Sequence, residues 1–235
     1  MVDARRIAED VAKVRERIAA AATRSGRTAD AVALVAVTKY ADDATIAALV
    51  EAGCHDLGES RPQQLWQRAI AFAPQAIHWH MIGHLQRNKV ARTLPAVALV
   101  HSCDSLRLAD AIDQSAAVQG IPPIPVLLEV NISDDPAKHG FAAAEVADAL
   151  AHLATLGQID VRGLMAMAGR PDDPAATRAD FRRLRELRDR LRGECPTAIT
   201  LDELSMGMSG DYEIAIEEGA TIVRVGSALV EGESQ

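Results

Sequence analysis

The chain has 235 residues, of which 49% are hydrophobic and 25% are charged, a composition typical of one large globular domain or two small ones. Its formal net charge of −8 and its pI near 5.4 disfavour nonspecific binding to nucleic acid or to an anionic membrane. The three cysteines, Cys54, Cys103 and Cys195, form no CxxC pair, so neither a zinc ribbon nor a disulfide framework is indicated.

The first predicted element is an amphipathic helix, because Ile7, Val11, Val14 and Ile18 recur at helical spacing. The N-terminal stretch MVDARRIAED is charged and has no apolar signal core. No segment of the chain is apolar over the length that a bilayer requires. We therefore expect a soluble, cytoplasmic protein.

Beyond this helix, short apolar runs alternate with helical patterns. Strand–helix–strand repetition predicts a parallel sheet, and near-continuous apolar strands indicate that both faces of this sheet are covered. The eight candidate strands are, in chain order, 33–38, 54–60, 77–82, 97–100, 124–132, 159–168, 203–209 and 221–230.

Eight such units in a chain of this length predict a single (β/α)8 barrel over residues 1–235. Five residues follow the last predicted strand, so the eighth helix is expected to be missing and the N-terminal helix to take its place. The alternative is a doubly wound open sheet, whose first turn normally carries glycines for a nucleotide. Here the first strand ends in Thr38-Lys39-Tyr40, without a glycine.

Lys39 lies at the carboxyl end of the first predicted strand, the end of a barrel where functional groups collect. A lysine in this position can simply be solvated. Alternatively, an amine that is desolvated at the barrel mouth loses pKa and becomes a nucleophile that forms a Schiff base with a carbonyl ligand. The simplest such ligand is pyridoxal 5′-phosphate.

Two loops near the C-terminus have the composition of a phosphate-binding cup, at the position where barrels of this type commonly bind phosphate. One offers Ser209 and Gly210 at the start of a predicted helix, and the other offers Gly226 and Ser227. Ordinary helix capping and turn formation explain the same residues. The coincidence of both loops with Lys39 favours the phosphate hypothesis.

Arg224 interrupts the apolar run IVRV and shares a strand face with Gly226. A buried cation requires a partner, and two are open. One is a structural ion pair with Glu129. The other is a hydrogen bond to the pyridine nitrogen of the cofactor, which would leave that nitrogen unprotonated and the ring a poor electron sink.

The stretch HWHMIGH places His78 and His80 on one strand face, a pattern that can bind zinc. His101 and His139 lack a matching ligand pattern, so we expect no metal site. Glu59, at the end of the second predicted strand, could contact Lys39 or the ligand, or could cap the next helix.

Several motifs make the sequence resemble the pyridoxal phosphate homeostasis proteins, a family related to the N-terminal barrel of alanine racemase. The resemblance covers almost the whole chain, and its motifs are VAVTK, AGCHDLGES, IHWHMIGHLQRNK, VHSCDS, LLEVNIS, VRGLMAMA, LSMGMSGDYEIAIEEGAT and VRVGSAL. It implies a fold-type III barrel in which Lys39 is the Schiff-base lysine and Arg224 faces the pyridine nitrogen. It further implies that the phosphate is surrounded by Ser209, Gly226 and Ser227, and that Asn131 lies in the pocket.

The sequence departs from the family at two places. Ser60 replaces the usual asparagine, and EGESQ replaces the usual residues after the last strand. The resemblance implies a carrier of pyridoxal 5′-phosphate that maintains intracellular vitamin B6 homeostasis without catalytic residues. Expected partners are the cofactor and apo forms of enzymes that use it, with no nucleic acid or membrane, and a monomer is expected rather than a dimer.

Three other functions are compatible with parts of the sequence. A weak amino-acid racemase is the alternative, although alanine racemases need a second domain that supplies a tyrosine, and this chain has only Tyr40 and Tyr212. A metal-dependent hydrolase would need more histidine ligands than the HxH pair. A pure interaction protein would leave Lys39, Arg224 and the two loops unexplained.

Overall fold

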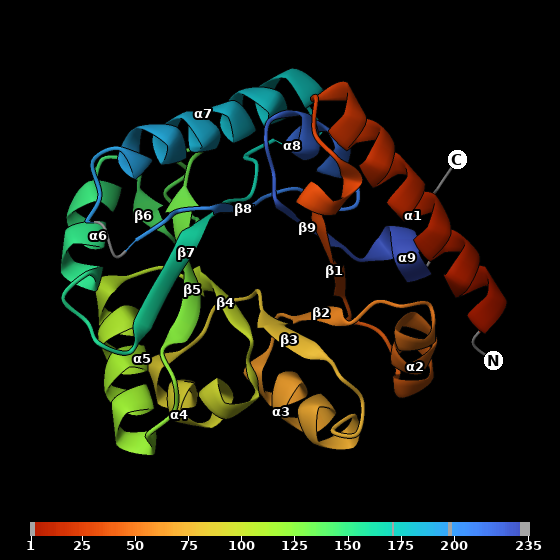
Figure 1. The fold of residues 1–235 in the computed structure, drawn as a ribbon, viewed down its shortest axis with the longest axis horizontal. Helices are drawn as coiled ribbons and strands as arrows, with labels where there is room; N and C mark the ends of the chain where they lie inside the picture. The colour runs from red at the N-terminus through yellow and green to blue at the C-terminus, as the bar shows by residue number, and fades with distance from the viewer. Residues whose placement is uncertain (1–2, 171, 197–198, 231–235) are drawn as a thin grey trace.

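Eight parallel strands form a closed barrel in the computed structural model, which describes residues 3–170, 172–196 and 199–230 (Figure 1). The strands follow one another around the barrel in the order β1, β2, β3, β4, β5, β7, β8 and β9, and β9 pairs with β1 to close it. Their bounds are β1 Ala33–Val37, β2 Asp56–Glu59, β3 His78–Met81, β4 Leu99–Cys103, β5 Ile124–Asn131, β7 Ile159–Met165, β8 Glu203–Ser205 and β9 Ile222–Val225. The predicted (β/α)8 barrel is therefore confirmed.

The helices lie outside the strands (Figure 1). Their bounds are α1 Ala4–Arg24, α2 Asp43–Glu51, α3 Pro62–Ala71, α4 Val90–Thr93, α5 Leu106–Gln119, α6 Val146–Leu153, α7 Pro174–Arg192, α8 Tyr212–Glu217 and α9 Ser227–Val230. Helix α1 packs against α2, α8 and α9, so it occupies the place expected for a last helix. Contrary to the prediction, β9 is followed by one turn of helix, α9. The segment EGESQ lies outside the described residues.

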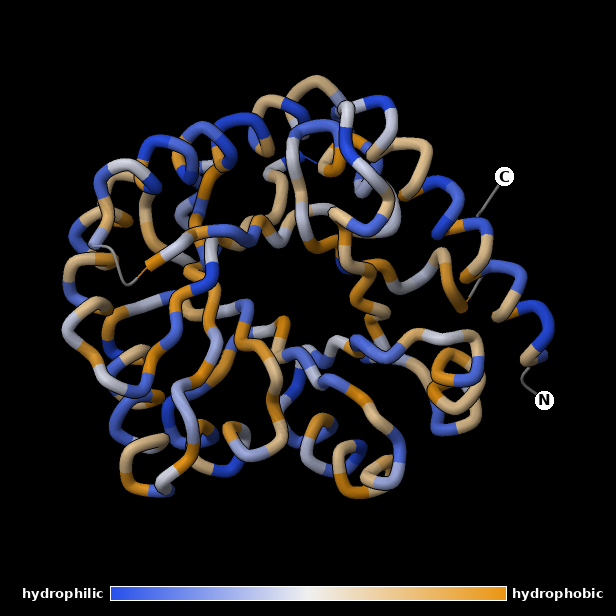
Figure 2. Tube along the Cα trace, in the orientation of Figure 1, coloured by the Kyte–Doolittle hydropathy of each residue, from blue (hydrophilic) through white to orange (hydrophobic). Residues whose placement is uncertain are grey.

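Two apolar clusters stabilise this arrangement. The small one consists only of strand residues: Val35, Leu99, Leu127, Met165 and Ile222. The large one fills the space between strands and helices. Figure 2 shows the consequence along the chain, with hydrophobic residues on the strands and hydrophilic residues frequent on the outer side of α7. None of the described helices meets the length and hydropathy that a membrane crossing demands.

Some predicted strand ends were wrong. β4 extends to Cys103 rather than ending at 100, because His101 and Ser102, on opposite faces of the strand, are both fully buried despite their polarity. β8 and β9 end at Ser205 and Val225, several residues earlier than predicted, because the chain there turns into loops and into α9. A short strand β6, Phe141–Ala142, pairs with the end of β5 and was not predicted.

Candidate functional site

Three adjacent strands bring most of the predicted site residues to one part of the barrel mouth. β8, β9 and β1 are neighbours, and Ala36 of β1 is paired with Val225 of β9. The loop after β9 therefore begins beside the end of β1. A Cβ atom placed on Gly226 would lie only 3.3 Å from Cβ of Val37, so this backbone approach suits glycine. Lys39 follows two residues later, in a turn.

The side chain of Lys39 is exposed, and its Nζ lies 5.1 Å from the ring centroid of Tyr40. Of the two alternatives considered from the sequence, this structure shows the solvated lysine. β1 ends at Val37 and Thr38 hydrogen-bonds to the carbonyl of Gly58 at 3.0 Å, so Lys39 begins the turn that leaves the barrel. The amine is accessible to a ligand that enters from solvent.

The turn that carries Lys39 is held in place by hydrogen bonds that involve a buried acid, Glu59. Glu59 accepts hydrogen bonds from the hydroxyl of Thr38 and from the guanidinium of Arg68 on α3. Arg68 also donates to the carbonyls of Thr38, at 2.8 Å, and Ala41, at 2.5 Å. Burial raises the pKa of Glu59, against the lowering effect of both partners. Glu59 therefore helps to position the residues on either side of Lys39, a role that was not considered from the sequence, and no side-chain hydrogen bond from the described residues caps α3.

Backbone N–H groups converge on Ser209. Its Oγ accepts hydrogen bonds from the N–H of Gly226 at 3.1 Å and of Ala228 at 3.5 Å, while Ser227 between them is exposed. Such N–H donors, together with hydroxyls, are the usual ligands of phosphate oxygens. In this structure both N–H groups are bonded to the hydroxyl of Ser209, and a phosphate oxygen would replace that hydroxyl as their acceptor.

The loop after β8 differs from its prediction. The helix α8 begins at Tyr212, so Ser209 and Gly210 lie in a turn before it rather than at its start. The N–H of Met208 is already bonded to the carboxylate of Asp211 at 2.6 Å. In this loop Ser209 is therefore the residue that meets the β9 loop.

Arg224 is buried inside the barrel and donates to the hydroxyl of Ser205 at 2.5 Å and to the carbonyl of Ala166 at 3.0 Å. Burial lowers the pKa of its guanidinium to about 10, opposed by the charges of Asp211 and Glu129. Among the described residues no ion pair joins Arg224 to Glu129, so the structural ion pair considered from the sequence is not formed. The acceptors that hold Arg224 are neutral.

Glu129 lies within the same barrel on β5 and is 7% exposed. Burial is the main reason that its pKa rises to about 7, and the charge of Asp104 adds to the rise. Arg224 and His84 act in the opposite direction. Glu129 is thus a carboxyl group that changes charge near neutral pH.

Asn131 ends β5 on another part of the mouth, and its side chain organises the following loop. Its Nδ2 donates to the carbonyl of Asp135 at 2.7 Å, and its Oδ1 accepts from the N–H of Asp135 and the hydroxyl of Ser133, both at 3.3 Å. Its predicted place in the pocket stays a prediction.

Two residues that contact Arg224 or its partner were missed from the sequence. Ser205 is the acceptor for Arg224, and His101 is completely buried with its Nδ1 2.8 Å from the Ser205 Oγ. A histidine within the run LVHSC, on the same strand face as Leu99, was the signal for His101. The signal for Ser205 was weaker: it is one small polar residue within the predicted strand 203–209.

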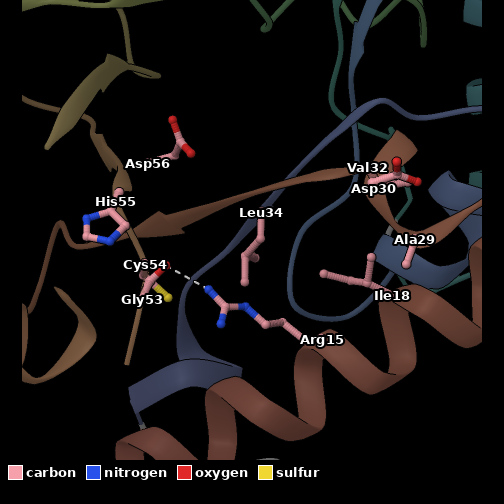
Figure 3. Close-up of a pocket in the computed structure, with 10 residues that line it drawn as sticks. All are labelled: Arg15, Ile18, Ala29, Asp30, Val32, Leu34, Gly53, Cys54, His55 and Asp56. Atoms are coloured by element: carbon pink, nitrogen blue, oxygen red, sulfur yellow. Dashed lines mark hydrogen bonds between the residues drawn. The ribbon is translucent and has the colours of Figure 1, made fainter. Parts of the chain in front are cut away.

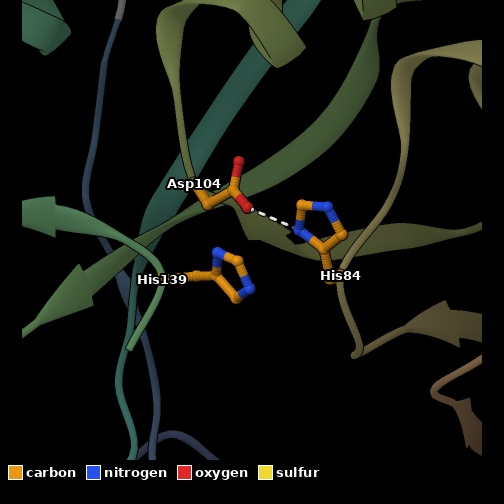
Figure 4. A group of neighbouring side chains, drawn as sticks. All are labelled: His84, Asp104 and His139. Atoms are coloured by element: carbon orange, nitrogen blue, oxygen red, sulfur yellow. Dashed lines mark hydrogen bonds and ion pairs between the residues drawn. The ribbon is translucent and has the colours of Figure 1, made fainter. Parts of the chain in front are cut away.

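The fold also gathers His84, Asp104 and His139 from three loops of the mouth, as Figure 4 shows. The Nδ1 of His84 lies 2.8 Å from Asp104, and the two imidazoles are stacked with centroids 4.6 Å apart and planes 18° apart. One possible ligand atom from each of the three residues lies within 4.8 Å of the others. The expectation of no metal site stays a prediction, and the observed contacts of the cluster are the His84–Asp104 hydrogen bond and the ring stack.

A separate cavity of about 350 Å³ opens at the amino ends of β1 and β2, away from the barrel mouth (Figure 3). Leu34 and Asp56 line it together with Arg15 of α1, which donates to the carbonyl of Gly53 at 2.7 Å. None of the predicted site residues lines this cavity.

Comparison with known proteins agrees with the fold and motifs. The family model described as alanine racemase, N-terminal domain, matches residues 9–233. The pyridoxal phosphate homeostasis protein of Aquifex aeolicus is 38% identical, over 94% of this chain and 96% of the relative, and that of Pseudomonas aeruginosa is 39% identical, over 95% and 94%. PipY of Synechococcus elongatus, solved with pyridoxal phosphate bound, superimposes with a TM-score of 0.83 at 32% identity, over 95% of this chain and 99% of PipY. The chain therefore belongs to the family of pyridoxal phosphate homeostasis proteins, built on the alanine racemase N-terminal barrel.

Proposed function

We propose that this protein binds pyridoxal 5′-phosphate as a Schiff base on Lys39 and serves vitamin B6 homeostasis as a carrier rather than as a catalyst. The observation that carries the proposal is the meeting of three adjacent strand ends. The accessible amine of Lys39 follows β1, and Ser209 follows β8. Arg224 lies on β9, and the two N–H donors that contact Ser209 lie in the segment after β9. The family relationship supports the same ligand.

The residues fit the two ends of the cofactor. The N–H groups of Gly226 and Ala228, with the hydroxyls of Ser209 and Ser227, would hold the phosphate. The amine of Lys39 would condense with the aldehyde: the Nζ–carbon double bond forms as the carbonyl oxygen leaves as one water molecule. The bond is reversible by hydrolysis, which suits release.

The environment of Arg224 supports storage over catalysis. A guanidinium only donates hydrogen bonds, so a pyridine nitrogen that faces it must be the acceptor and stay unprotonated. The cofactor supplies an electron sink when bound, and this sink is weakened in that state. We therefore propose a carrier that hands the cofactor to apo-enzymes, and not an efficient racemase. The monomeric state expected from the sequence stays a prediction.

Borohydride trapping of the loaded protein tests the proposal directly. Reduction should fix the cofactor on Lys39, as read by peptide mass spectrometry, and Lys39→Ala should abolish both the visible absorption band and the trapped adduct. Lys138→Ala is the matched control, since Lys138 also lies in a loop beyond a strand of the barrel and donates to the carbonyl of Ala168. It should load as the wild type does.

A trapped adduct on another lysine would contradict the proposal. The carrier role is checked by mixing the loaded protein with an apo-enzyme, whose activity should recover faster than in a matched concentration of free cofactor. Sustained interconversion of D- and L-alanine by the loaded protein would favour the racemase instead.

A further inference from the structure

A continuous chain of hydrogen bonds crosses the barrel interior and ends on Arg224. Asp56 Oδ1 lies 3.1 Å from His80 Nε2, and His80 Nδ1 lies 2.9 Å from His101 Nε2. His101 Nδ1 lies 2.8 Å from Ser205 Oγ, which accepts from Arg224 at 2.5 Å. The five residues come from β2, β3, β4, β8 and β9.

The two ends of this chain lie in different environments. His101 and Ser205 are fully buried, His80 is 7% exposed, and Arg224 is 4% exposed. The side chain of Asp56 is 40% exposed and lies at the cavity between the amino ends of β1 and β2, where Figure 3 shows it. The chain thus connects a carboxylate accessible to solvent with a guanidinium deep in the barrel.

Hydrogen-bond chemistry determines the direction of every bond when both histidines are neutral. The carboxylate of Asp56 only accepts, so the proton of His80 is on Nε2 and its Nδ1 accepts from His101. His101 then carries its proton on Nε2, and its Nδ1 accepts from the hydroxyl of Ser205. The oxygen of Ser205 is left to accept from Arg224. In each of the four hydrogen bonds, the donor is therefore the residue nearer to Arg224 along the chain and the acceptor is the residue nearer to Asp56.

A proton added to His80 reverses the middle of the chain. Both ring nitrogens of His80 then donate, so Nε2 of His101 must accept and its proton must move to Nδ1. That proton now points at Ser205, whose oxygen receives donors from both His101 and Arg224. The hydroxyl hydrogen of Ser205 loses its acceptor. Burial keeps the pKa of His101 far below its ordinary value, so His101 itself does not take up the added charge.

We propose that Asp56, His80, His101 and Ser205 are positioning residues for Arg224, which aim its guanidinium at the cofactor and make that contact sensitive to protonation of His80. The proposal rests on the proposed function, in which Arg224 faces the pyridine nitrogen. It adds a route by which solvent at one end of the barrel acts on a cofactor at the other.

Among the residues that the structure describes, several charged or titratable groups lie around His80. Asp56 on β2 and His101 on β4 contact it directly. His78 on its own strand shares the same oxygen of Asp56 at 3.2 Å, and Arg224 on β9 lies behind Ser205. The hydrogen bond from His80 is the main reason that the pKa of Asp56 is lowered, which favours the charged form of Asp56.

The test follows the visible absorption band of the loaded protein from about pH 5 to about pH 8, the range in which histidine changes charge. Asp56→Asn keeps an acceptor for His80 but removes the charge that favours its protonation. The pH midpoint of the band should therefore move down by about half a pH unit or more. Asp30→Asn is the matched control, because Asp30 lines the same cavity and is exposed. It should leave the midpoint unchanged.

Ser205→Ala breaks the chain next to Arg224 and should remove this pH dependence, whereas Ser205→Thr keeps the hydroxyl and should restore it. Circular dichroism verifies that each variant folds. Asp56→Asn is expected to fold, because it changes a side chain that is partly exposed. In the protein without cofactor, proton–nitrogen spectra of the imidazoles should place the His101 proton on Nε2 at about pH 8 and on Nδ1 once His80 is charged.

The two proposals fail in different ways. A wild-type protein that forms no visible band sinks the proposed function, and the role toward the cofactor with it. Suppose instead that the wild-type protein loads normally, but that its band matches those of Asp56→Asn and Ser205→Ala at every pH. This result overturns only the proposed role of the hydrogen-bond chain. A His101 proton that stays on Nδ1 at about pH 8 overturns it as well.

Discussion

At the scale of single residues, the barrel interior contains ionisable groups whose burial carries a desolvation penalty. Arg224 and Glu129 are both buried, and burial favours the neutral form of each group. It lowers the pKa of Arg224 to about 10 and raises the pKa of Glu129 to about 7. Such groups are more often functional than stabilising, because an apolar side chain would pack there without a desolvation penalty. This agrees with a site in which Arg224 is kept for its ligand.

Glu129 predicts a stability difference that depends on pH. Its pKa rises from 4.5 to about 7 on folding, so between these values the folded state retains a proton that the unfolded state releases. Stability from this group therefore falls as pH rises through that window. Glu129→Gln cannot ionise and should gain about 3 kcal/mol over the wild type at about pH 8, with little gain at about pH 4.

Urea unfolding at both pH values measures this difference. Glu186→Gln, on the exposed side of α7, is the control and should show no gain at either pH. An equal effect of Glu129→Gln at both pH values would mean that packing, and not ionisation, explains it.

At the scale of elements, α1 completes the ring of helices. Its apolar residues Ile7, Val11, Val14 and Ile18 are all buried. Its outer arginines reach α8, where Arg24 bonds Glu213 and Glu217, both at 2.8 Å. Exposed ion pairs of this kind contribute little, so the apolar face carries most of the docking energy.

Truncation within that face should therefore destabilise the protein. Val14→Ala removes two methyl groups from a fully buried side chain and should cost about 2 kcal/mol of unfolding free energy. Glu16→Ala, on the exposed face of α1, should change it by less than about 0.5 kcal/mol. Chemical denaturation compares the two variants, and equal losses would show that α1 is not docked through its apolar face.

At the scale of the whole molecule, closure of the barrel depends on close backbone contact. β7 and β8 pair through Gly163 and Glu203, and a Cβ atom on Gly163 would overlap the carbonyl oxygen of Glu203. β8 carries Ser205 and leads to Ser209. The pairing that closes this part of the barrel therefore also places two residues of the candidate site.

Gly163→Ala should consequently force β7 and β8 apart and cost more than about 2 kcal/mol of unfolding free energy. Gly157→Ala is the matched control, because nothing lies within 4 Å of a Cβ atom added there. Urea unfolding should separate the two substitutions clearly, and cofactor loading should fall only for Gly163→Ala. Equal stability of the two variants would contradict the importance of this contact.

The amino-acid sequence alone determined the barrel, the order of its strands and the identity of Lys39, Ser209, Arg224 and Gly226 as candidates. These inferences rest on local apolar patterns and short motifs, which a chain displays without being folded. Only the tertiary structure decided that Lys39 is exposed and that neutral acceptors hold Arg224. Likewise, nothing local joins Asp56, His80, His101 and Ser205, because their contacts depend on the register of strands far apart in the chain.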